Sequence, residues 1–123
     1  MAFLNDRVFD NGLTTLDTEA NVVHVTSAEA TTYAAATSTL TLGNSTSLSI
    51  AAPSDRTGGG RKVTVSAISD GSITGTGTVT HYALVDTTNT RLLATAALTA
   101  SQSVTSGNTF TLASFDIGIP DPS

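Results

Sequence analysis

Apolar residues alternate with polar ones along much of the chain, and this period of two constrains the fold more than any other feature. In residues 38–52, Leu40, Leu42, Leu48 and Ile50 all occupy even positions. Successive side chains of a strand point to opposite faces of its sheet, so such alternation indicates half-buried strands. Further strand-like segments cover residues 21–27, 61–69, 72–86, 91–98 and 109–119. Six or seven short strands predict an all-β fold, a single antiparallel β-sandwich that could be jelly-roll-like.

Two of these segments break the alternation. In residues 72–86, Val79 and Tyr82 fall on opposite faces of the expected strand, so either both faces are covered or a bulge shifts the register. In residues 109–119 the apolar parity switches near 113–114, which predicts a bulge or a kink at that point. Turn residues are expected to separate the strands at 43–46, 70–71 and 87–90.

Two parts of the chain lack the alternation. Residues 1–20 are expected to form an N-terminal arm, with a helical turn that ends at Asn11 and Gly12, before a β-sandwich domain of residues 21–123. Two alternatives stay open for this arm: it packs on its own domain, or it docks on a neighbouring subunit. A capping box of Thr26 and Glu29 predicts one short helix over about 28–37.

Composition and charge exclude several classes of partner. A length of 123 residues suits one domain. A net charge of −5, with 12% charged residues, argues against binding to nucleic acid or to an anionic membrane surface. Cysteine is absent, which removes disulfides and thiolate metal sites. No signal peptide or membrane-spanning segment is expected. Because 38 residues are Ser or Thr and only one is Lys, the surface should be neutral and built from small side chains.

The sequence offers little for catalysis. Only His24 and His81 could act as a base, and both lie in strand-like segments, where a side chain on a sheet face is the simpler interpretation. The G-x-S-x-G pattern is absent, and the scattered carboxylates do not match a calcium-binding loop, although a calcium ion between loops or subunits stays an open alternative. We therefore expect no enzyme, no cofactor and no protein-held metal.

The stretch "SDRTGGGRKVTV" gathers three of the five basic residues around three glycines. A phosphate-binding loop would need Ser or Thr directly after the lysine and a helix behind it. Here Lys62 is followed by Val63 and a strand-like segment, so the pattern fails. Two interpretations are left: a solvated turn before a strand, or a loop whose cations meet acidic or carbonyl groups of a neighbouring subunit.

Several phrases together carry a resemblance that spans nearly the whole chain. They are "GLTTLDTEA", "EATTYAAATSTLTLGN", "APSDRTGGGRKVTV", "SDGSITGTGTVTHYALVD", "RLLATAALTASQSVTSGNTFTL" and "DIGIPDP". In these the sequence resembles small structural proteins of tailed bacteriophages, of the kind encoded among head genes. The resemblance implies a virion component made in the host cytoplasm. Its closest role is a capsid decoration (cement) protein, a β-rich homotrimer on the outer capsid surface at three-fold and quasi-three-fold junctions of the major capsid protein.

A decoration protein would need surfaces that contact other subunits. The candidate contacts combine the apolar and basic residues of the arm with the cations of the glycine-rich loop. They are Phe3, Leu4, Arg7, Phe9, Arg56, Arg61 and Lys62. Two alternatives stay open: a head-fibre or host-binding adhesin module, and a tail or connector component that completes a ring.

Overall fold

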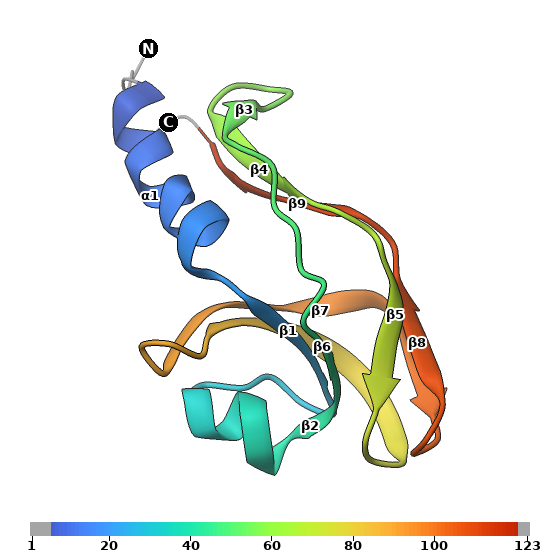
Figure 1. The fold of residues 1–123 in the computed structure, drawn as a ribbon. Coiled ribbons are helices and arrows are strands. Elements are labelled where there is room, and N and C mark those ends of the chain that lie inside the picture. Colours follow the sequence, from blue (N-terminus) through green and yellow to red (C-terminus); the bar gives the residue numbers. More distant parts are fainter. Residues whose placement is uncertain (1–5, 121–123) are drawn as a thin grey trace.

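The computed structural model describes the backbone of residues 6–120 and the side chains of residues 10–120. Two antiparallel sheets make up most of it, and the all-β sandwich expectation is confirmed. The larger sheet has the order β7-β6-β1-β2-β5-β8 and curls into a half-barrel, while the smaller one has the order β3-β4-β9 (Figure 1). The elements are α1 (Asp6–Glu19), β1 (Val22–Thr26), η1 (Ala35–Thr39), β2 (Thr41–Ser45), β3 (Ser54–Asp55), β4 (Arg61–Val65), β5 (Ile68–Ile73), β6 (Gly77–Asp86), β7 (Arg91–Val104), β8 (Thr109–Leu112) and β9 (Phe115–Ile119).

A bent two-stranded ribbon joins the two sheets. One side of it is β4 followed by β5, and the other is β8 followed by β9; each side changes sheet at a short break, at 66–67 and at 113–114 (Figure 1). The kink predicted at 113–114 is therefore confirmed. The single strand expected over 61–69 is wrong, because the chain divides there between the two sheets.

The turns expected at 70–71 and 43–46 are wrong, since both glycines lie inside strands. Gly71 belongs to β5 beside a register shift, and a Cβ there would overlap the ring of Phe110. Gly43 belongs to β2, where a Cβ would overlap the carbonyl oxygen of Ser72 on the neighbouring strand. Each glycine therefore serves a close approach rather than a reversal of the chain.

The hairpin of β6 and β7 explains the mixed parity of residues 72–86. From Tyr82 to Asp86 every residue of β6 is buried, and the ladder to β7 also shifts register twice. Both explanations offered for the sequence therefore apply. The tight turn expected at 87–90 is confirmed: the Asp86 carboxylate accepts hydrogen bonds from the backbone N–H groups of Thr88 and Asn89, at 3.0 and 3.3 Å.

The short helix lies further along the chain than expected. Thr26 is fully buried in β1 and its Oγ1 donates to the carbonyl oxygen of Ala28, so it forms no capping box. Helical backbone begins at residue 33, where Thr32 Oγ1 accepts a hydrogen bond of 3.0 Å from the Ala35 N–H. The segment ends as a π-helical turn, η1, whose buried Ala36 belongs to a small apolar cluster on the outer face of β6.

Helix α1 is longer than the turn expected at the N-terminus. It continues through Gly12, since burial of Leu13 and Leu16, which lie one turn apart, offsets the cost of about 1 kcal/mol for a glycine inside a helix. Both leucines join the main core with side chains of β1, β4 and β6. Two alternatives were open for the N-terminal segment. Residues 10–19 follow the first of them, because they pack on their own domain. Within residues 6–120, no helix combines the length and apolarity needed to cross a membrane.

Candidate functional site

The glycine-rich stretch forms the loop of a hairpin between β3 and β4. Gly58, Gly59 and Gly60 have φ angles of 91°, 103° and 94°, in the left-handed region that side-chain-bearing residues rarely adopt. A Cβ on Gly60 would also overlap the carbonyl oxygen of Ile119 in the neighbouring strand β9. The loop leads directly into a strand, so it presents no helix N-terminus to a phosphate group.

Arg61 lies at the centre of an ion-pair network that ties α1 to the smaller sheet. Its Nε donates to Asp10 Oδ1 at 2.9 Å, and its Nη1 donates to Asp55 Oδ1 at 2.6 Å. A further bond of 3.3 Å runs from Nη2 to the carbonyl oxygen of Pro53. The Arg61 side chain is only 17% exposed. This guanidinium therefore acts inside the subunit, between the helix and the sheet.

Lys62 and Arg56 also have partners in their own chain. Lys62 Nζ donates to Asp116 Oδ2 at 3.1 Å, across the β4–β9 ladder, and Thr64 Oγ1 donates to Asp116 Oδ1 at 2.7 Å. These hydrogen bonds, that of Thr64 first, hold the pKa of Asp116 below its ordinary value. Arg56 Nη1 donates to the carbonyl oxygen of Gly59 at 2.9 Å. We call α1 and the β3-β4-β9 sheet, with these paired charges, the charged end.

The seven predicted contact residues therefore divide into two groups. Phe3 and Leu4 lie outside the described residues, and Arg7 and Phe9 lie in α1 with side chains outside them. Arg56, Arg61 and Lys62 gather on one sheet, where groups of the same chain already bind all three cations. The prediction that they contact a neighbouring subunit stays a prediction, but they do not form a free cationic patch.

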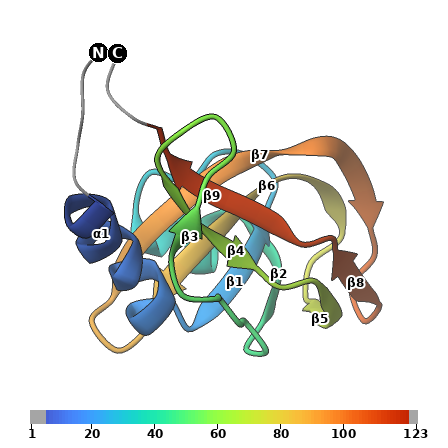
Figure 2. The same cartoon turned by 90° about the horizontal axis from the view of Figure 1, so that it is seen from above.

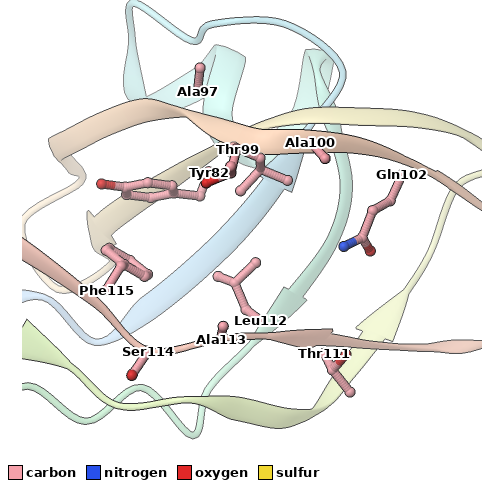
Figure 3. A pocket seen from close by; sticks show the side chains of 11 residues that line it. Tyr82, Ala97, Thr99, Ala100, Gln102, Thr111, Leu112, Ala113, Ser114 and Phe115 are labelled. Atoms are coloured by element: carbon pink, nitrogen blue, oxygen red, sulfur yellow. The ribbon is translucent and has the colours of Figure 1, made fainter.

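A second candidate lies at the bend of the ribbon, where β8 passes into β9. Strands β7 and β8 are the two edges of the curled sheet, and a cavity of 300 Å³ opens between them (Figure 3). We call it the β7–β8 pocket. Its walls and floor come from β6, β7 and the β8–β9 segment. The lining residues are Tyr82, Ala97, Leu98, Thr99, Ala100, Gln102, Thr111, Leu112, Ala113, Ser114 and Phe115.

A wide bulge in β7 shapes this pocket. Ala97 pairs with His81 and Gln102 pairs with Val79, so the four residues 98–101 lie opposite Thr80 alone. The extra length carries the strand away from β6 and places Leu98, Thr99 and Ala100 in the pocket wall. No sign of this bulge is visible in the sequence, because residues 98–103 show no apolar period.

Aromatic rings close one side of the β7–β8 pocket. The rings of Tyr82 and Phe115 lie 4.4 Å apart at 42°, in a tilted arrangement (Figure 3). Tyr82 and Leu112 are buried, and burial raises the pKa of the Tyr82 hydroxyl. None of the eleven lining residues carries a charge. The parity break at 113–114 was the one sequence signal near this site.

Each of the two histidines, the side chains that could act as a base, has a threonine hydroxyl beside it. His24 Nδ1 is 2.8 Å from Thr41 Oγ1, and His81 Nδ1 is 2.8 Å from Thr80 Oγ1. Burial lowers the pKa of His24, which favours the neutral imidazole. Over the described part of the chain, no three His, Cys, Asp or Glu side chains come close enough together to hold a metal ion.

Comparison of the chain with protein-family models, with curated proteins and with solved structures finds no match. Beyond the resemblance in the sequence, a function must therefore be argued from the charged end and the β7–β8 pocket.

Proposed function

We propose that this protein is a structural component of a tailed-phage virion, a decoration protein that binds the outer surface of an assembled capsid. The observation that carries the proposal is the surface of β7. Residues 96–103 are all exposed except Leu98, and no residue of 92–104 is charged. Small uncharged side chains lose little entropy when they are covered by a partner.

Long uncharged strand edges are normally covered, because they pair readily with other chains. Within the described residues, β7 pairs with no strand other than β6, and β8 with none other than β5. Such edges suit a protein that is built into an assembly.

The charge of the molecule supports the outer rather than the inner capsid surface. A net charge of −5 would be repelled by the packaged genome, whereas the outer surface has no such conflict. A trimer at a three-fold junction would bury several weak contacts at once, and these add through multivalency. Binding only to the assembled shell would stabilise that shell by mass action.

Copy number per virion tests the proposal. Purified particles are analysed by quantitative mass spectrometry against the major capsid protein. We expect the number of copies to follow the number of three-fold junctions, on the order of hundreds, because closed symmetry repeats the contact over the whole shell. About a dozen copies or fewer would contradict a decoration protein and indicate a tail, connector or fibre component instead.

A further inference from the structure

We infer that the β7–β8 pocket binds an extended, uncharged segment of another polypeptide, which lies along β7 and places one branched aliphatic side chain in the pocket. Strand addition to an open sheet edge combines backbone hydrogen bonds, which give affinity, with side-chain pockets, which give specificity. Three observations carry the inference: the two edges, the chemistry of the lining and the size of the cavity.

The first observation is that the pocket lies between two edges of one curled sheet. Both β7 and β8 have a strand on one side only within the described residues. The pocket is lined from β7 on one side and from β8 and the start of β9 on the other (Figure 3). The course of β7 (orange) and of β8 and β9 (red) can be followed in Figure 2. An extended segment here would continue the curl of the sheet, and backbone groups of β7 could pair with it.

The second observation is the absence of charge in the lining. The walls carry Ala, Thr, Ser and Gln side chains and Leu98, while the floor carries Tyr82 and Leu112 beside Phe115 (Figure 3). A charged occupant would lose its hydration and find no opposite charge, so an uncharged segment is favoured. Small wall residues also allow the backbone of an occupant to come close.

The third observation is the size of the cavity. Its volume of 300 Å³ is about twice that of an apolar cavity of roughly 150 Å³ that accepts benzene. It therefore has room for one aliphatic side chain with its backbone and not for a folded surface. A single anchor side chain in a desolvated pocket, with weaker contacts around it, is the usual arrangement of a binding hot spot.

The test uses the full chain and a defined probe, the blocked peptide acetyl-SVTLTVS-amide, titrated into ¹⁵N-labelled protein. Amide signals of residues 97–102 and 111–115 should shift and exchange more slowly with solvent, while those of β4 should not change. The matched peptide with Gly in place of the central Leu should bind about tenfold more weakly, because it lacks the anchor. A peptide with Asp at that place should not bind.

Protein variants separate the pocket from the rest of the surface. Ala100→Leu fills the pocket and should weaken binding of the Leu peptide about tenfold, whereas the matched Ala52→Leu, on an exposed loop, should leave it unchanged. If Ala100→Leu unfolds, Thr99→Asp takes its place. It puts a charge in the wall and should likewise weaken binding of the Leu peptide.

Three results would each overturn the inference: no shift at these amides, equal affinity for the Leu and Gly peptides, or equal affinity of the pocket variants and wild type. A fourth is that the same amides shift when the protein alone is concentrated and sedimentation shows a dimer, since the occupant is then a second copy of this chain. Peptide binding is a property of the pocket and does not depend on the role proposed for the protein in a virion.

Discussion

The charged end and the bend of the ribbon differ in how their polar groups are used. At the charged end, Arg61 binds both Asp10 and Asp55, and Lys62 binds Asp116. At the bend, the lining of the β7–β8 pocket has no charge and lies between two strand edges. The concentration of cations in the sequence therefore marks a region whose charged groups already bind partners in the same chain. The pocket proposed to bind a partner is lined mostly by Ala, Ser and Thr.

Of the variants proposed for this comparison, truncation of Leu13, which holds α1 to the core, should have the largest effect on stability. Leu13→Ala removes a buried side chain from the core between α1 and the β-domain, and should lower the free energy of unfolding by about 3 kcal/mol. Urea denaturation at constant pH measures this change. The exposed neighbour Asn11→Ala serves as the control and should change stability by less than about 0.5 kcal/mol. Equal stability of Leu13→Ala and wild type would mean that α1 is a detachable arm after all.

The helix also shows where sequence reasoning succeeded and failed for the fold. The strand-like segments 21–27, 72–86 and 91–98 correspond to β1, β6 and the first part of β7, and the parity break at 113–114 located the crossing between sheets. The predictions at Gly12, Gly43 and Gly71 were wrong. Local preference alone indicated a helix end at Gly12 and turns at Gly43 and Gly71. In the structure, Gly43 and Gly71 make room for atoms of a neighbouring strand, and Gly12 stays helical because Leu13 and Leu16 are buried. Such long-range contacts leave no local pattern.

Loss of the central guanidinium should have the next largest effect. Arg61→Ala leaves the Asp10 carboxylate, 34% exposed, without its bond to Arg61, and should destabilise the protein by about 2 kcal/mol. Lys62→Ala is the matched control. Its pair is more exposed, with side-chain exposures of 28% and 50%, and should contribute less than about 1 kcal/mol. Urea denaturation of both variants at low and high salt measures the difference. If the two variants prove equally stable, the contrast between a structural Arg61 and a surface Lys62 fails.

The candidate sites were predictable to different degrees. The clustering of Arg56, Arg61 and Lys62 was visible in the sequence, but their carboxylate and carbonyl partners were not, because Asp10 and Asp116 lie 51 and 54 residues away from Arg61 and Lys62. The β7–β8 pocket left almost no trace in the sequence. It depends on a bulge opposite Thr80 and on the curl of the whole sheet, which only the three-dimensional pairing of strands defines.

The smallest effect we expect is a pH dependence confined to the charged end. The pKa of Asp116 is lowered in the folded protein by Thr64 and Lys62, so its ionised form stabilises the fold. This contribution is fully present above the ordinary pKa of 3.8 and is lost as the pH falls through the lowered folded value. Asp116→Asn should therefore be less stable than wild type at neutral pH, and the gap should close as the pH falls from about 4 to about 2. Urea midpoints across this range measure the gap.

A second variant and a control sharpen this result. In a Thr64→Val background, Asp116→Asn should cost less stability at neutral pH, because the main hydrogen bond to the carboxylate is absent. Ser101→Ala, in the uncharged bulge of β7, is the control. Its urea midpoint should differ from that of wild type by the same amount at every pH. A gap for Asp116→Asn that stays constant down to about pH 2 would show that the carboxylate gains nothing from its partners, and that the charged end is a solvated surface like any other.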